Sequence, residues 1–111
     1  MKLFLYSNGA KYGGVGSGAI SAKGLDNPYH NRKLRALNGL HPAVQADVMK
    51  ARNAEALVAK VIERALQDGE VTVYCHAGRH RSVSIIEVAA QRLRAAGHEV
   101  HVLHACKDRW P

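Results

Sequence analysis

Short apolar runs along the chain predict three β-strands, at residues 2–6, 71–74 and 99–103. The first run places Leu3, Phe4 and Leu5 in succession, which is typical of a buried strand. Residues 19–25 are a weaker candidate for one more short strand. The segment 7–18 carries five glycines, so we expect it to form a loop.

Apolar residues at helical spacing predict three helices between these strands. Pro42 suits the first turn of one helix, because proline is favoured there. Asn53 is a candidate N-cap for a second helix, which we expect to end at Gly69. The third covers residues 83–97 and is closed by Gly97.

The order of these elements predicts the fold class. Residues 71–103 form a strand–loop–helix–strand unit, which normally joins two parallel strands. We therefore expect a single α/β domain over residues 1–111, with a small, mainly parallel sheet flanked by helices. Ligands bind beyond the carboxyl ends of such strands. If the first strand is also parallel, residues 7–13, 75–82 and 104–106 meet at this edge.

The 75–82 loop, between a predicted strand and a predicted helix, suits an anion. Its residues are Cys75, His76, Ala77, Gly78, Arg79, His80, Arg81 and Ser82. A strand-to-helix turn supplies successive backbone N–H groups and the positive end of a helix dipole. Gly78 lets the backbone turn closely, and Arg81 can bind two phosphate oxygens. We expect this loop, together with Lys11, to hold a phosphate or sulfate group.

Net charge points to acidic partners. Sixteen Lys and Arg against nine Asp and Glu give +7, and residues 71–86 contain no acidic residue at all. Such a balance favours phosphate esters or nucleic acid, although a merely solvated basic surface explains it equally well. If RNA binds, the contacts expected outside the loop are Arg32, Lys33, Lys107 and Arg109.

Several protein classes are disfavoured by composition. No apolar run approaches the ~20 residues that cross a membrane, so we expect no membrane partner. Two cysteines are too few for a disulfide scaffold and indicate a reducing cytoplasm. His98, His101 and His104 suggest metal binding, but on a strand His101 points away from the other two. We therefore expect no metal and no other cofactor.

The spacing of Cys75 and Arg81 resembles the His-Cys-x5-Arg-Ser/Thr signature of cysteine-dependent phosphatases. The resemblance implies Cys75 as nucleophile and Arg81 as phosphate clamp. Tyr74 stands where the signature has histidine, and no upstream loop offers an obvious leaving-group acid, so Asp26 and Asp47 are candidates only by default. A phosphatase is therefore the alternative to a binding module, and we expect binding with little turnover.

A second resemblance covers nearly the whole chain. The 75–82 loop and the valine after it are similar to Cys-Thr-Gly-Gly-x-His-Arg-Ser-Val of the RapZ C-terminal domain family, with His76 and Ala77 as replacements. Ser-Asn-Gly-Ala-Lys-Tyr-Gly at 7–13 is similar to its Ser-Phe-Gly-Phe-Lys-Tyr-Gly. Leu-Arg-Ala-Leu-Asn-Gly-Leu at 34–40 is similar to its Leu-Arg-Pro-Leu-Thr-Gly-Leu. Asn27-Pro28 matches an Asn-Pro turn of the family.

This resemblance implies a module that senses a phosphosugar, an amino-sugar phosphate in the best-known members, and that contributes to RNA binding. The matching motifs and the end of the last strand add residues expected around the ligand: Ser7, Asn8, Tyr12, Asn27, Arg35 and His104. No Gly-x4-Gly-Lys-Ser/Thr motif occurs in the chain, so we expect a stand-alone module without the family's ATP-binding half. A third alternative is an interaction module whose loop holds only adventitious anions.

Overall fold

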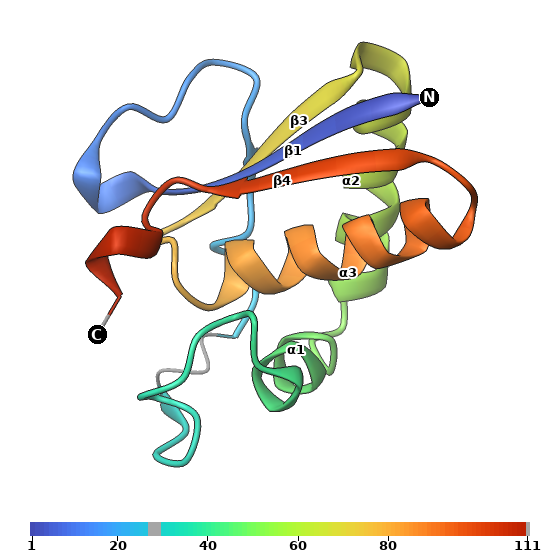
Figure 1. Ribbon diagram of the computed structural model, residues 1–111. Helices are drawn as coiled ribbons and strands as arrows, with labels where there is room; N and C mark the ends of the chain where they lie inside the picture. Colours follow the sequence, from blue (N-terminus) through green and yellow to red (C-terminus); the bar gives the residue numbers. More distant parts are fainter. Residues whose placement is uncertain (27–29, 111) are drawn as a thin grey trace.

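The computed structural model describes residues 1–26 and 30–110 and contains one parallel sheet (Figure 1). Its strands lie in the order β2-β3-β1-β4. They are β1 (Lys2–Gly9), β2 (Ile20–Ser21), β3 (Glu70–Cys75) and β4 (Glu99–His104). Since β1 pairs in parallel with both β3 and β4, the predicted α/β class with a parallel sheet is confirmed.

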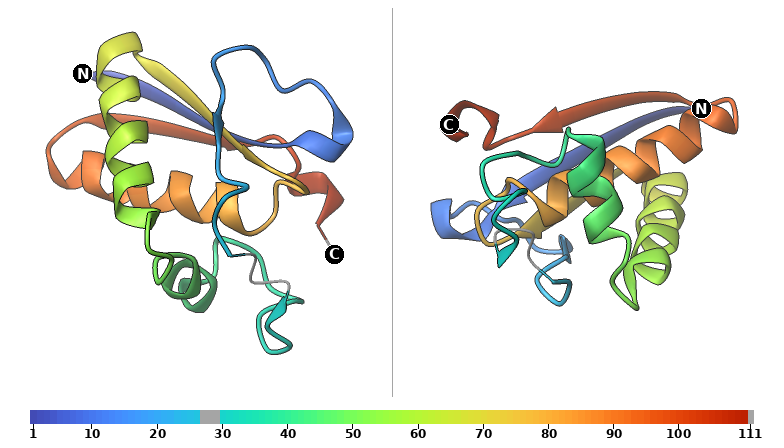
Figure 2. Two further views of the ribbon diagram at one scale, coloured as in Figure 1. Left: turned by 180° about the vertical axis from the view of Figure 1, so that it is seen from behind. Right: turned by 90° about the horizontal axis from the view of Figure 1, so that it is seen from below.

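The helices lie on the same side of this sheet, as two further views show (Figures 1 and 2). They are α1 (Pro42–Val48), α2 (Ala54–Asp68) and α3 (Arg81–Ala95). Two short 3-10 helices follow strand ends: η1 (Ala10–Tyr12) after β1, and η3 (Lys107–Arg109) after β4. No helix in the described ranges is long and apolar enough to cross a bilayer.

The alternation of side chains along the strands explains the two layers. Leu3, Leu5 and Val73 point toward the helices and are buried in the core. Phe4 and Leu103 point to the opposite face, where they are 36% and 59% exposed. Burial of one face against α2 and α3 fixes the register, because a slip of one residue would expose the whole apolar set.

The helix ends mostly follow the predicted signals. Pro42 opens α1, and the His41 ring accepts a hydrogen bond from the backbone N–H of Ala43. Gly69 ends α2 with φ +80, a left-handed conformation that glycine adopts without strain. Asn53 is the N-cap of α2, but its side chain forms no capping hydrogen bond.

One predicted boundary is wrong. The glycine-rich segment was expected to be loop from Ser7 onward, whereas β1 continues to Gly9. The reason is long-range pairing: Ser7 lies opposite Val73, and Gly9 lies opposite Cys75. The weaker strand expected within residues 19–25 is present as β2. The Asn27-Pro28 turn lies outside the described residues.

Candidate functional site

The ends of three strands meet at one edge of the sheet, as expected from the parallel topology. The register pairs Gly9 of β1 with Cys75 of β3, and Ser7 of β1 with His104 of β4. The segments that follow each strand therefore lie side by side. This edge brings together η1, the 75–82 loop and η3.

Gly78 allows the loop to contact the end of β1 backbone to backbone. Its φ is +64, and an added Cβ would lie 2.8 Å from the Gly9 nitrogen and 3.0 Å from Cys106 Sγ. Reciprocally, a Cβ on Gly9 would lie 2.7 Å from the Ala77 carbonyl carbon. Gly78 is thus required both by conformation and by space, whereas Gly9 is required by space alone.

The Cys75 thiol is enclosed by the start of α3. Its side chain is 2% exposed, and Sγ lies 3.2 Å from Ser82 Oγ and 3.5 Å from the Ser82 backbone nitrogen. The Ser82 hydroxyl donates to the Asn8 carbonyl at 3.3 Å. Ser82 therefore ties the loop to the end of β1 and places a hydroxyl over the sulfur.

The backbone of the 75–82 loop offers free donors. Within the described part of the chain, the N–H groups of residues 77–81 donate to no protein acceptor. They include Arg81, the first residue of α3, where intrahelical acceptors are missing and the helix dipole is positive. An anion placed here would receive several N–H groups and a favourable field.

Arg81 is the buried cation of the site. It is 7% exposed, and its Nη1 donates to the carbonyls of Lys23 at 2.8 Å and Leu25 at 3.3 Å. Its Nε is buried without a hydrogen-bond partner, and no carboxylate of the described residues pairs with it. Part of the guanidinium thus holds the segment after β2, while its positive charge has no counter-ion among residues 1–26 and 30–110.

His80, predicted as a ligand contact, also joins the loop to residues before α1. Its Nε2 donates to the Leu37 carbonyl at 2.7 Å, and the Gly39 backbone N–H donates to the Arg79 carbonyl at 2.8 Å. Burial lowers the pKa of His80 and outweighs the opposing effect of the Leu37 bond, and the charges of Arg79 and Arg81 lower it further. The neutral ring therefore fastens residues 35–39 to the loop.

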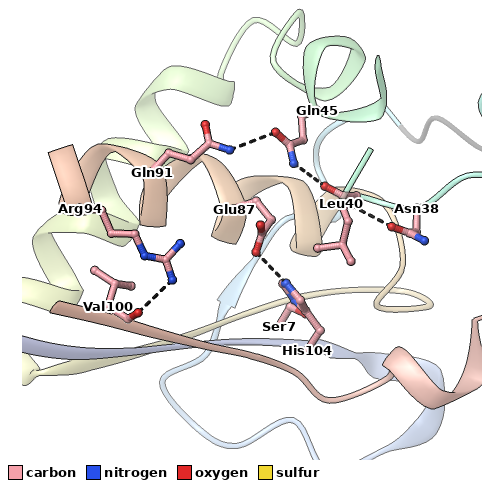
Figure 3. Close-up of polar contacts among 10 residues, drawn as sticks. Ser7, Asn38, Leu40, Gln45, Glu87, Gln91, Arg94, Val100 and His104 are labelled. Atoms are coloured by element: carbon pink, nitrogen blue, oxygen red, sulfur yellow. Dashed lines mark hydrogen bonds and ion pairs between the residues drawn. The ribbon is translucent and has the colours of Figure 1, made fainter. Parts of the chain in front are cut away.

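Beneath the loop lies a chain of hydrogen bonds that sequence reasoning missed (Figure 3). The hydroxyl of Ser7, fully buried, lies 2.6 Å from His104 Nδ1, and His104 Nε2 lies 2.9 Å from Glu87 Oε2. Glu87 points from α3 toward His104, so the chain joins α3, β4 and β1. Its sequence signal is Glu87, a single acidic residue in a helix whose other buried positions after Arg81 are apolar or small.

The C-terminal segment packs on the loop. Trp110 Nε1 donates to the Gly78 carbonyl at 3.0 Å, and its ring centroid lies 5.9 Å from that of His104. The Arg109 guanidinium lies 4.2 Å from the centroid of the Tyr12 ring, and Lys11 Nζ lies 5.1 Å from it. Arg109, expected as an RNA contact outside the loop, therefore lies at the same ring as Lys11, a residue of the predicted phosphate site.

The remaining predicted residues are more peripheral. His76 is exposed at the start of the loop, Ala77 is half-buried, and Asn8 Oδ1 accepts a hydrogen bond from the Gly9 backbone N–H. The other predicted cations lie exposed on turns and on η3: Arg32, Lys33, Arg35 and Lys107. Asn27 lies outside the described residues. Among residues 1–26 and 30–110, no three His, Cys, Asp or Glu side chains are grouped to hold a metal ion.

Comparison with known proteins identifies the family of this chain. The model of the RapZ C-terminal domain matches residues 1–108. A nucleotide-binding protein of Desulforapulum autotrophicum is 32% identical over 98% of this chain and 42% of its own length. Another, of Rubrobacter xylanophilus, is 39% identical over 76% of this chain and 32% of its own length. The chain thus matches less than half of each relative. It belongs to the RapZ C-terminal domain family.

Proposed function

We propose that this RapZ-like binding module holds a phosphorylated small molecule in the 75–82 loop. The observation that carries the proposal is the buried charge of Arg81, which no described carboxylate pairs, beside N–H groups that find no acceptor among the described residues. A buried ion without a counter-ion is unfavourable by several kcal/mol. A phosphate group at the start of α3 would supply both the negative charge and the missing acceptors.

The ligand class we propose is a phosphosugar, which the family resemblance implies. The relatives are named nucleotide-binding proteins, and a nucleotide also carries phosphate. Because this chain matches less than half of each relative, their name supports a phosphorylated ligand here only in general terms. The phosphate would lie in the loop, and the sugar would extend toward η1 and η3.

Calorimetry tests this function with inorganic phosphate and glucosamine-6-phosphate as the probes. We expect Arg81→Ala to weaken binding at least tenfold, since charge-assisted hydrogen bonds contribute about 1.5–3 kcal/mol. Arg81→Lys keeps the charge without the planar donors and should bind with intermediate affinity. The matched control is Arg92→Ala, an exposed arginine on the same helix. Unchanged affinity in a folded Arg81→Ala variant would contradict the proposal.

A phosphatase is the second candidate, favoured by the enclosure of Cys75 Sγ by the Ser82 hydroxyl and N–H. A leaving-group acid typically contributes about 100- to 10,000-fold in rate. The two candidate acids do not belong to the loop around Cys75, because Asp26 is exposed after β2 and Asp47 lies on α1. We therefore expect binding with little turnover. Hydrolysis of an aryl phosphate that disappears in Cys75→Ser would instead make the protein an enzyme.

RNA is a further proposed partner, supported by exposed cations outside the loop. Arg32, Lys33, Lys107 and Arg109 form no ion pair within the described part of the chain. If RNA binds through them, affinity should fall steeply with salt as counterions are released. Gel-shift titration at two salt concentrations measures this slope, and no shift at low salt would leave the metabolite as the partner.

A further inference from the structure

We propose that the site takes a ligand with two anionic groups, one held by the 75–82 loop and the other by Arg109 and Lys11, which replaces the expectation that Lys11 holds the same phosphate as the loop. The ligand class is a phosphosugar that carries a second phosphoryl or carboxylate group. This inference rests on the proposed function, because it extends the same site toward η1 and η3.

Lys11 and Arg109 are gathered at one aromatic ring. Both charged groups lie within 5.1 Å of the centroid of the Tyr12 ring, although the two residues come from opposite ends of the chain. Within the described ranges, neither forms a salt bridge. The Tyr12 ring offsets only part of their mutual repulsion, because each cation–π contact at an exposed site contributes about 0.5–1 kcal/mol.

Backbone and side-chain bonds hold this pair beside the loop. The backbone N–H of Lys11 donates to the His76 carbonyl at 2.9 Å. On the other side, Trp110, the residue after Arg109, donates to the Gly78 carbonyl at 3.0 Å. The backbone at Lys11 and the residue after Arg109 are thus both bonded to the loop, which is why we assign the loop and the pair to one ligand.

The hydrogen bonds among Ser7, His104 and Glu87 hold in place the end of β4, from which the segment carrying Arg109 continues. His104, bonded to Ser7 and Glu87, ends β4 and contacts the Trp110 ring. The next residue, Ala105, donates its backbone N–H to the Ser7 carbonyl at 3.0 Å. Arg109 is thus carried on a segment that is anchored at both of its ends, so less ordering is needed when a ligand binds.

The charge of the pair selects the second group of the ligand. An anionic group beside Lys11 and Arg109 would relieve the repulsion between two like charges, whereas a protonated amine would add a third. Both side chains are exposed, so the gain is moderate and depends on salt. We expect the second anionic group to raise affinity about tenfold, the sum of two exposed contacts.

Glucose 6-phosphate and glucose 1,6-bisphosphate are the matched probes. Trp110 is the single tryptophan of the chain and contacts the loop, so its fluorescence reports binding, with calorimetry as a second readout. The measured quantity is the ratio of the two affinities in one protein. We expect a ratio of about ten in the wild type, falling to about three in Lys11→Ala and in Arg109→Ala. Lys60→Ala, an exposed lysine on α2, controls for net charge and should keep the wild-type ratio.

Different outcomes test the second anionic subsite and the phosphate binding on which it rests. Failure of both sugar phosphates and of inorganic phosphate to bind would overturn the proposed function itself. A wild-type ratio near one, with clear binding of both ligands, would overturn only the second anionic subsite. So would equal weakening of both ligands by Lys11→Ala, because Lys11 would then hold the same phosphate as the loop.

Discussion

The contact between Gly78 and Gly9 can be tested by adding one methyl group at a time. Gly78→Ala introduces two penalties: a Cβ at φ +64, and a clash with backbone atoms of Asn8 and Gly9 at 2.8–2.9 Å. Gly9→Ala introduces only the clash, because its φ of −121° is ordinary for alanine. Gly69→Ala introduces only the left-handed conformation, since its φ is +80 and no atom lies within 4 Å.

These three variants separate the cost of the left-handed conformation from the cost of the steric clash. The left-handed conformation costs alanine about 1 kcal/mol, and a forced overlap in a packed region costs about 1–3 kcal/mol. We therefore expect the free energy of unfolding to fall by about 1 kcal/mol in Gly69→Ala, by about 2 kcal/mol in Gly9→Ala and by about 3 kcal/mol in Gly78→Ala. At about 4 °C per kcal/mol for a domain of this size, Tm should fall by about 4, 8 and 12 °C.

Thermal denaturation followed by circular dichroism provides the assay. The double variant Gly9→Ala with Gly78→Ala should lose less than the sum of the single losses, because one separation of the two backbones relieves both clashes. Equal losses for Gly78→Ala and Gly69→Ala would refute the reasoning, since the close approach would then contribute nothing. Full additivity in the double variant would refute it as well.

Three further predictions concern the groups around the loop. His104→Leu should lower the free energy of unfolding by about 2–4 kcal/mol, because the Ser7 hydroxyl and the Glu87 carboxylate lose their partner. Urea denaturation measures this change. Trp110→Phe should lower Tm by about 4 °C, since it removes one hydrogen bond of about 1 kcal/mol to the loop. Because burial lowers the pKa of His80, the unfolded chain binds more protons as pH falls below about 6.5. The contribution of the neutral His80 ring to the free energy of unfolding should therefore be complete above that pH and decrease below it.

Each of these predictions has a control. Adding Ser7→Ala to His104→Leu should restore part of the loss, because no buried hydroxyl is then left unpaired; no restoration would mean that the loss comes from packing alone. For Trp110, Trp110→Phe should change stability more than Lys60→Ala. His80→Gln should flatten the decrease below about pH 6.5, and an unchanged slope would assign that decrease to another group.

The sequence predicted the fold class because local signals and topology agreed. Gly69 and Pro42 mark helix ends through their own backbone restrictions, which need no tertiary partner. The end of β1 was missed for the opposite reason. Gly9 looks like a loop residue locally, and only its pairing with Cys75 keeps it in the sheet.

The position of the candidate site at the edge of the sheet could be predicted from the sequence, whereas most of its side-chain contacts could not. Parallel topology brings the strand ends together whatever their side chains, so the meeting of Ser7 and His104 at one edge could be foreseen. The direction of Arg81 toward the carbonyls of Lys23 and Leu25 could not, because those carbonyls come from a segment distant in sequence. The same holds for Arg109, which is placed beside Tyr12 by the path of the chain after β4.

The central position of β1 determines the order in which this domain can fold. Its two partners, β3 and β4, are made long after it, and the Ser7–His104 contact spans 97 residues. A chain emerging from the ribosome must therefore hold its first strand unpaired until β3 appears, and can complete the sheet only once β4 is out. Such long-range pairing makes folding slow relative to a helical bundle of equal size. In the meantime, the exposed edges of β1 are where the nascent chain is most open to wrong partners.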